Sequence, residues 1–181
     1  MKKFCTFLGT VGFMLTGCSE HSTTDYAANQ PKLDIREYLN GPLVAKGILF
    51  DYTGKADLMF LVKMTGRWHG NTGTLEEHFT YSDGRTEERT WTITFTDDHH
   101  FTATAGDVIG DAKGTQHGNA VNMRYRLNAT RASGDTITLS MDDWMYLLDE
   151  NTLINRTKMR KFGLNVGELV ITFEKVKRHE G

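Results

Sequence analysis

Apolar and polar residues alternate along most of the chain after Pro31. In the stretch 121–127 every second residue is apolar, and the residues between them are Asn or Arg. Successive side chains of a strand point to opposite faces, so this alternation predicts strands with one buried and one solvated face. The same period of two recurs at 58–64, 91–95, 137–141 and 169–173.

Short polar segments that contain Gly or Asp separate these runs. Asp-Gly and similar pairs supply the positive φ that tight hairpins require. The sequence therefore predicts about nine or ten strands joined by short turns, with a break at 149–151. The expected strand ranges are 43–52, 56–68, 74–82, 86–96, 100–105, 108–115, 119–129, 135–142, 144–157 and 166–176.

Consecutive hairpins in this number form either a sandwich or a barrel, and closure into a barrel removes the exposed sheet edges. We therefore expect an all-β fold, an antiparallel, up-and-down, lipocalin-like barrel of about 8–10 strands. Residues 33–40 have apolar residues at helical spacing and precede Gly41-Pro42. They predict a short N-terminal helix or plug at one end of the barrel.

The N-terminus has the order of segments found in a bacterial lipoprotein signal peptide. Lys2 and Lys3 precede an uncharged, largely apolar stretch at 4–15, which is shorter than the ~20 residues of a membrane-spanning helix. The stretch leads into Leu-Thr-Gly and then Cys18. We expect 1–17 to be a cleaved signal peptide and Cys18 to be lipidated. An ordinary signal peptide with a chance cysteine is the alternative.

Acylation of Cys18 would make the membrane the first partner of this protein. Each buried CH₂ is worth about 0.8 kcal/mol, so two or three acyl chains anchor a protein almost permanently. Ser19 follows the cysteine, and a residue other than Asp at this position favours the bacterial outer membrane. We expect 18–31 to be a flexible tether and 32–178 to be a single β-barrel domain that faces the periplasm.

Charge and cysteine content exclude several classes of function. The formal charge is −2, and removal of the two leader lysines leaves 19 basic and 23 acidic residues, so no nucleic-acid partner is expected. Cys5 lies in the leader, so the mature chain has no disulfide partner and no cysteine for a metal or a nucleophile. The basic run 156–161 suits phospholipid head groups, but a solvated turn is the simpler interpretation.

A metal site is one candidate chemistry, because the histidines at 99 and 100 follow the aspartates at 97 and 98. Imidazole and carboxylate groups are common ligands of divalent metals. These residues fall at a hairpin tip, where adjacent side chains point to opposite faces, so a solvated turn is favoured. We expect no metal and no cofactor.

Four stretches identify a family resemblance: 30–41 (QPKLDIREYLNG), 73–84 (GTLEEHFTYSDG), 142–146 (DDWMY) and 161–163 (KFG). Together they resemble the proteobacterial lipoprotein family called domain of unknown function 3833, over roughly residues 30–176. The resemblance implies a lipocalin-like fold. The family has no assigned catalytic residues to carry over.

The alternation places several polar and aromatic residues inside the barrel. Glu77 and Asp143 share the face of apolar neighbours, and either Asn155 or Arg156 enters the barrel. Buried carboxylates need partners, so an internal ion pair that also involves Tyr125 is one interpretation. The other is a polar anchor for an acyl ligand, with an apolar wall formed by Phe60, Trp68, Trp91, Trp144 and Phe162.

Three functions remain open at this stage. The first is a lipoprotein that binds a lipid, such as a fatty acid or phospholipid, or another small apolar ligand in a barrel cavity. The second is a non-catalytic structural or assembly lipoprotein that acts through protein–protein contacts and has a solid barrel. The third is an enzyme that uses Glu77 and Asp143, as in glycoside hydrolysis.

Overall fold

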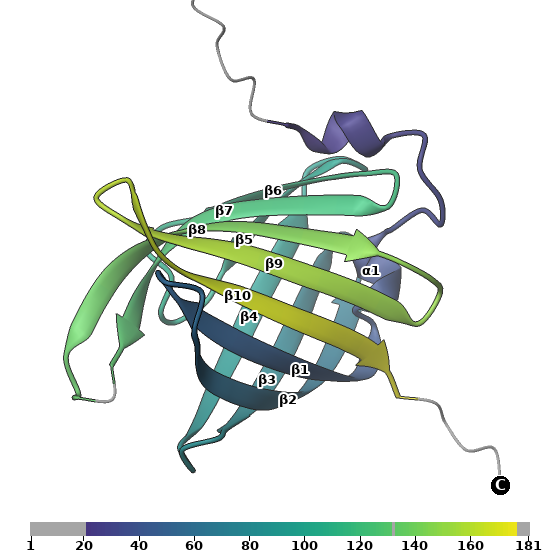
Figure 1. Ribbon diagram of the computed structural model, residues 1–181. Coiled ribbons are helices and arrows are strands. Elements are labelled where there is room, and N and C mark those ends of the chain that lie inside the picture. The colour runs from purple at the N-terminus through teal and green to yellow at the C-terminus, as the bar shows by residue number, and fades with distance from the viewer. Residues whose placement is uncertain (1–20, 132, 177–181) are drawn as a thin grey trace, which may run out of the picture.

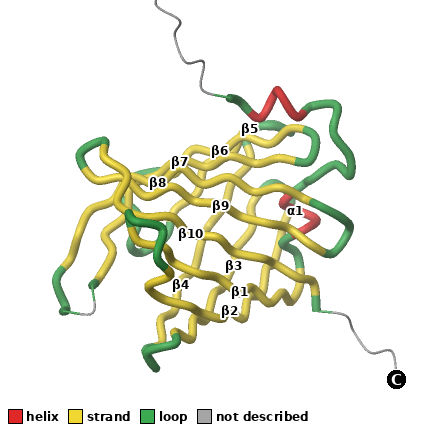
Figure 2. The backbone as a smooth tube through the Cα atoms, in the orientation of Figure 1, coloured by secondary structure: helices red, strands yellow, loops and turns green. Residues whose placement is uncertain are grey.

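The computed structural model describes residues 21–131 and 133–176, which form a β-barrel with two short helical segments (Figures 1 and 2). The first helical segment is a 3₁₀ turn, η1 (Thr23–Tyr26), and the second is α1 (Ile35–Tyr38). The strands are β1 (Gly41–Asp51), β2 (Ala56–His69), β3 (Thr72–Tyr81), β4 (Thr86–Phe95), β5 (His100–Thr104), β6 (Ala112–His117), β7 (Ala120–Thr130), β8 (Thr136–Leu147), β9 (Thr152–Lys161) and β10 (Leu164–Lys175).

Each strand pairs antiparallel with the strand that follows it, and β1 also pairs with β10. The closing register runs from Leu43 opposite Lys175 to Asp51 opposite Gly167. The result is a closed up-and-down barrel of ten strands, which confirms the fold class expected from the alternation. Closure leaves no exposed sheet edge among the strands that the structure describes.

The sequence-based boundaries differ most from the structure at the eighth and ninth strands, and the sixth strand begins at Ala112 rather than at 108. The eighth strand does not end at 142 but continues to Leu147, and the break expected at 149–151 is the hairpin to β9. Asp143 takes an inward position and interrupts the apolar alternation, which made the strand look shorter than it is. Asp149 stabilises the hairpin, because its Oδ1 accepts hydrogen bonds from the backbone N–H groups of Asn151, at 2.8 Å, and Thr152, at 2.9 Å.

Helix α1 closes one end of the barrel, as the spacing at 33–40 predicted. Asp34 caps the helix by accepting a 2.9 Å hydrogen bond from the backbone N–H of Arg36. Tyr38 is buried and its Oη donates to the carbonyl of Phe173 at 3.0 Å. Gly66 permits this close approach, because a Cβ at that position would lie 1.7 Å from the carbonyl oxygen of Leu39.

The segment before α1 packs on the outer wall, which corrects the expected flexible tether for residues 21–31. Thr23 is buried and its Oγ1 donates to Thr115 Oγ1 at 3.0 Å. The ring of His21 stacks on Trp144 with centroids 4.2 Å apart, and Tyr26 packs against the same indole. The polar composition of this segment concealed these aromatic contacts.

The predicted signal peptide and Cys18 lie outside the described residues, so cleavage and lipidation stay predictions. Within 21–131 and 133–176, neither helical segment has the length or the hydrophobicity to cross a bilayer.

Candidate ligand-binding cavity

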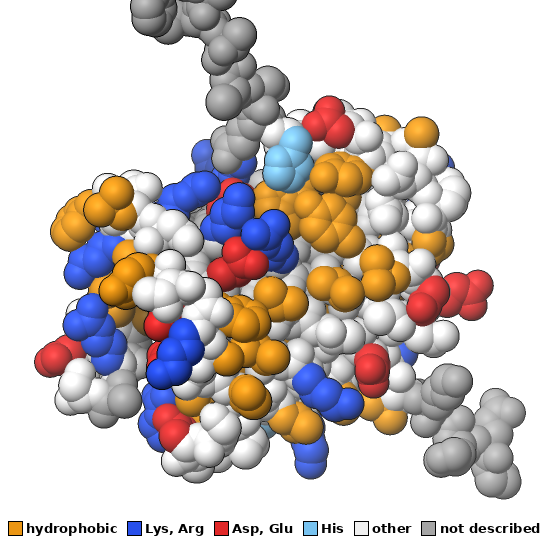
Figure 3. All heavy atoms as spheres, viewed as in Figure 1, with side chains coloured by type: hydrophobic (Ala, Val, Ile, Leu, Met, Phe, Trp, Pro, Cys, Tyr) orange, Lys and Arg blue, Asp and Glu red, His pale blue; other side chains and the backbone are white. Residues whose placement is uncertain are grey.

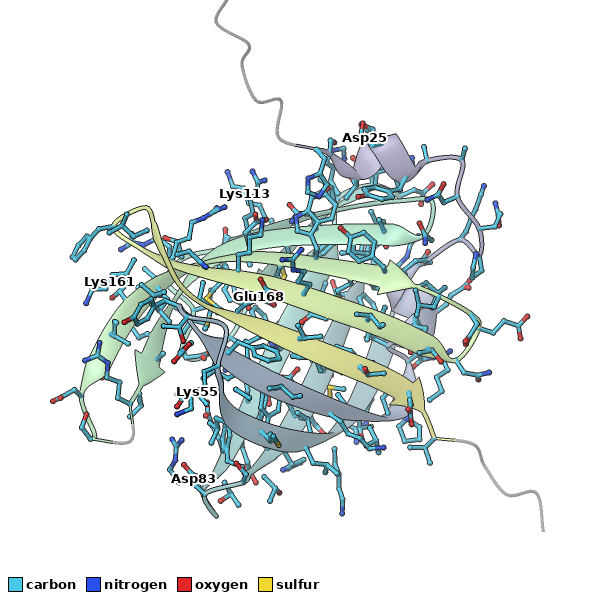
Figure 4. The ribbon with its side chains drawn as sticks, viewed as in Figure 1. Asp25, Lys55, Asp83, Lys113, Lys161 and Glu168 are labelled. Atoms are coloured by element: carbon cyan, nitrogen blue, oxygen red, sulfur yellow. The ribbon has the colours of Figure 1, made fainter. Side chains whose placement is uncertain are left out.

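The barrel is hollow and encloses a cavity of about 660 Å³, within the range of about 300–1,000 Å³ typical of small-molecule sites. Ile35 of α1 and Leu39, which follows the helix, line its floor. We call the opposite end the mouth, where Figure 4 shows Lys55 and Asp83. Exposed residues at hairpins of the mouth also line the cavity, so it reaches solvent there: Asp57, Asp83, Arg85, Asn128 and Thr130.

The cavity stays open because two large rings lie against glycines on the wall. Phe60 pairs across the sheet with Gly47, and Phe101 with Gly114. A Cβ at Gly47 would lie 2.3 Å from the Phe60 ring, and one at Gly114 would lie 2.0 Å from the Phe101 ring. A larger residue at either position would therefore force the ring off the wall and into the cavity.

Most of the wall is apolar and aromatic. Phe79 and Tyr81 stack on each other at 5.9 Å, and Phe60 packs against both. On another part of the wall, Trp91 and Tyr125 make an edge-to-face contact at 5.4 Å. Such surfaces bind apolar molecules through the hydrophobic effect and dispersion contacts.

The first polar group on the wall contains Glu77, Arg89 and Asp107. Arg89 Nη2 lies 2.9 Å from Asp107 Oδ2, and its Nη1 lies 3.9 Å from Glu77 Oε2. Burial raises the pKa of Glu77 to about 7, although the Arg89 charge acts in the opposite direction. The carboxyl is therefore partly protonated at neutral pH.

This first group also contains polar atoms without hydrogen-bond partners. Among the described residues, Glu77 Oε2, Arg89 Nε and Asp107 Oδ1 are buried and make no hydrogen bond. A buried polar atom left unpaired is destabilising by about 1–3 kcal/mol. A hydrogen bond from a polar atom of a ligand to this group would therefore contribute more binding free energy than one elsewhere in the cavity.

The second polar group surrounds Asp143. Its carboxylate accepts hydrogen bonds from Asn155 Nδ2, from Thr157 Oγ1 at 3.0 Å and from Tyr125 Oη at 3.4 Å. Burial raises the pKa of Asp143 to about 6, although these donors lower it. Burial also raises the pKa of Tyr125 well above its usual value, so the phenol stays a hydrogen-bond donor.

Six of the nine residues proposed from the sequence for the barrel interior lie on its inner side. Five of them line the cavity: Phe60, Glu77, Trp91, Tyr125 and Asp143. Trp68 is also on the inner side, but it covers Gly73 and packs against Phe95.

The other three proposed residues lie on the outside, which corrects their expected positions. Trp144 follows the inward Asp143, so it points outward and packs under His21. Arg156 lies outward and pairs with Glu168 at 2.8 Å, and its neighbour Asn155 enters the barrel instead. Phe162 forms the β9–β10 turn with a positive φ of 51° and is 93% exposed.

Sequence reasoning missed Arg89 and Asp107. Arg89 alternates in phase with Trp91 and Ile93, so parity could have placed its side chain inside. Asp107 lies in the segment between β5 and β6, where no periodicity indicates a direction.

The two carboxylates considered for catalysis lie on different strands, and the charge of Asp143 still reaches Glu77 and raises its pKa. Glu77 lies on β3 and Asp143 on β8, five places apart in a ring of ten strands. They therefore come from opposite walls, and Asp143 already accepts from three donors. Because these donors belong to the wall itself, Asp143 is not free to act as the acid or base of a carboxylate pair such as glycoside hydrolysis uses.

The histidines and aspartates at 97–100 form a turn that is held by hydrogen bonds. Asp97 Oδ1 accepts hydrogen bonds of 2.7 and 2.8 Å from the backbone amides of His99 and His100. In the part of the chain that the structure describes, no three His, Cys, Asp or Glu side chains are grouped as metal ligands would be.

Fold and cavity together define a hollow, lipocalin-like β-barrel. The chain belongs to the family described as "Protein of unknown function (DUF3833)", whose profile matches residues 12–175. No curated protein matches it in sequence.

Solved structures with similar folds come from distant proteins. The S-type phycobiliprotein lyase CPES from Guillardia theta has a TM-score of 0.57 at 5% identity, over 79% of this chain and 91% of that one. Rv2717c from M. tuberculosis has a TM-score of 0.57 at 16% identity, over 82% and 99%. A DUF3598 protein from Nostoc punctiforme has a TM-score of 0.56 at 13% identity, over 81% and 51%. These likenesses support the fold alone.

Proposed function

We propose that this protein is an outer-membrane lipoprotein, anchored through acyl chains on Cys18, whose barrel binds a small apolar ligand such as an acyl chain. The observation that carries the proposal is the hollow, mostly apolar cavity with two buried polar groups on its wall. Ligand sites in proteins commonly combine an apolar wall with a few polar groups that fix orientation. A structural or assembly role predicts a solid barrel instead.

The charges on the cavity wall indicate the polar end of the ligand. Six carboxylates and two guanidinium groups line the cavity, and Arg89 is already 2.9 Å from Asp107. An anionic end would compete with these carboxylates for one buried cation. A hydroxyl or ester that hydrogen-bonds near Glu77 avoids this repulsion. We therefore favour an acyl chain with an uncharged polar end over a free fatty acid.

A competition experiment tests both parts of the proposal. We expect the neutral apolar dye N-phenyl-1-naphthylamine to bind saturably, with one site per chain. Dodecanol should displace it at a concentration several-fold below that needed for dodecanoate at pH 8. Absence of saturable dye binding would contradict the cavity function. If dodecanoate displaced the dye at a lower concentration than dodecanol, only the proposal of a ligand with an uncharged polar end would be contradicted.

A further inference from the structure

The outer wall across β6–β10 carries an excess of positive charge. Three adjacent cross-strand rows bring together six cations and two carboxylates, which leaves four positive charges in excess. We call this surface the basic face. Its cations are Lys113, Arg124, Arg126, Arg156, Lys158 and Arg160, and its carboxylates are Asp142 and Glu168.

The two carboxylates do not neutralise this face. Asp142 lies 3.2 Å from Arg124 Nε and 3.9 Å from Arg160 Nη1, and Glu168 pairs with Arg156. The three arginine side chains stay 38–56% exposed despite these pairs. Figure 3 shows Lys and Arg side chains gathered on this face beside an apolar patch, and Figure 4 shows Lys113 on it. A surface of this kind attracts anions.

The position of the N-terminal segment fixes the direction in which the basic face points. His21 stacks on Trp144, and Trp144 pairs across the sheet with Arg156. Only three peptide units separate His21 from Cys18, and three units reach at most about 11 Å. If Cys18 is acylated, as the proposed function requires, the bilayer surface lies close to this wall.

Exposed apolar residues continue the basic face toward the mouth. Phe162 is 93% and Leu164 72% exposed at the β9–β10 turn, next to Arg160 and Lys161. This turn lies at the same end as the β1–β2, β3–β4 and β7–β8 turns, which is the mouth end. Aromatic and aliphatic side chains beside lysine and arginine favour the boundary between head groups and acyl chains.

We infer that the basic face docks on anionic phospholipid head groups, with Phe162 and Leu164 inserted at the membrane boundary. Charge complementarity and the short reach from Cys18 both select the bilayer as the occupant. In this orientation the mouth of the cavity lies beside the membrane. An apolar ligand could then move between bilayer and barrel over a short path.

The test uses the unacylated chain that begins at residue 18, with Cys18→Ser. All strand pairings and the packed N-terminal segment lie within the described residues, so this chain keeps the whole barrel. We expect it to bind vesicles of phosphatidylglycerol and phosphatidylcholine, and not vesicles of phosphatidylcholine alone. High salt should weaken this binding, because it screens the charges.

A pair of charge-reversal variants locates the surface. Lys113→Glu with Lys158→Glu should raise the vesicle Kd about tenfold or more. Lys46→Glu with Lys63→Glu makes the same change in net charge on the outer face of β1 and β2 and should raise it far less. Equal effects of the two pairs, or binding without salt dependence, would overturn the inference.

Separate measurements distinguish failure of the inference from failure of the proposed function. Dye binding reports on the cavity, and both charge-reversal variants should keep it, because none of their substituted residues lines the cavity. The mass of the full chain produced in bacterial cells reports on acylation at Cys18. An intact, acylated protein with no preference for anionic vesicles would contradict the docking surface alone.

Discussion

Replacement of Ala129 by tryptophan will raise the Kd for N-phenyl-1-naphthylamine at least tenfold, equivalent to about 1.4 kcal/mol of lost binding free energy. Ala129 is half-buried, lies on β7 near the mouth and lines the cavity. An indole at this position would occupy the entrance, where the present side chain is a single methyl group. Fluorescence titration of the dye measures the effect.

Ala56→Trp is the matched control for this variant. Ala56 is exposed at the same end of the barrel and does not line the cavity. The control should bind the dye as the unmodified protein does. If both variants lose binding equally, or if Ala129→Trp binds normally while folded, the dye does not enter through the mouth that the structure defines.

Burial of Glu77 makes the stability of the fold depend on pH. Because burial raises the pKa of Glu77 from 4.5 to about 7, the folded state holds a proton that the unfolded state has released between these values. The stabilisation of the folded state by the Glu77 carboxyl is therefore fully present below about pH 4.5, and it is lost as the pH rises through 7. The full loss is on the order of 3–4 kcal/mol, from about 1.36 kcal/mol for each pKa unit between 4.5 and about 7.

Glu77→Gln replaces the titrating carboxyl by an amide and should make the free energy of unfolding less dependent on pH. Urea unfolding from pH 5 to pH 8 should show a smaller fall in unfolding free energy than in the unmodified protein. Part of the fall will remain, because burial also raises the pKa of Asp143 to about 6. Glu76→Gln, at the adjacent outward position, should leave the profile unchanged. An equal pH dependence in the Glu77 and Glu76 variants would contradict the burial of Glu77.

Alternation predicts a large part of this structure, because a period of two indicates a strand and also tells which of its side chains point into the barrel. It places Glu77, Tyr125 and Asp143 inside, and their side chains line the cavity. The same rule, applied through residue 156, would have put Arg156 outside and Asn155 inside. The sequence predicts only a break at 149–151 within one strand, 144–157, and a break of unknown geometry leaves the phase of the residues that follow it undetermined.

Other features depend on contacts that periodicity does not encode. Trp144 and Phe162 were placed inside because they are aromatic, yet one packs under His21 and the other forms a turn. The hollow interior depends on rings that lie over Gly47 and Gly114. These contacts decide whether a barrel is solid or hollow, and the sequence pattern is the same in both cases.

Native mass spectrometry will show whether the barrel holds an apolar ligand. Full-length protein extracted gently from bacterial membranes should show one additional small molecule per chain beyond the acyl chains on Cys18. Lipid extraction should identify that molecule as an acyl compound, and the Ala129→Trp variant should lack it. Folded protein that carries no such molecule, alike in the unmodified chain and in the Ala129→Trp variant, would contradict ligand binding in the barrel.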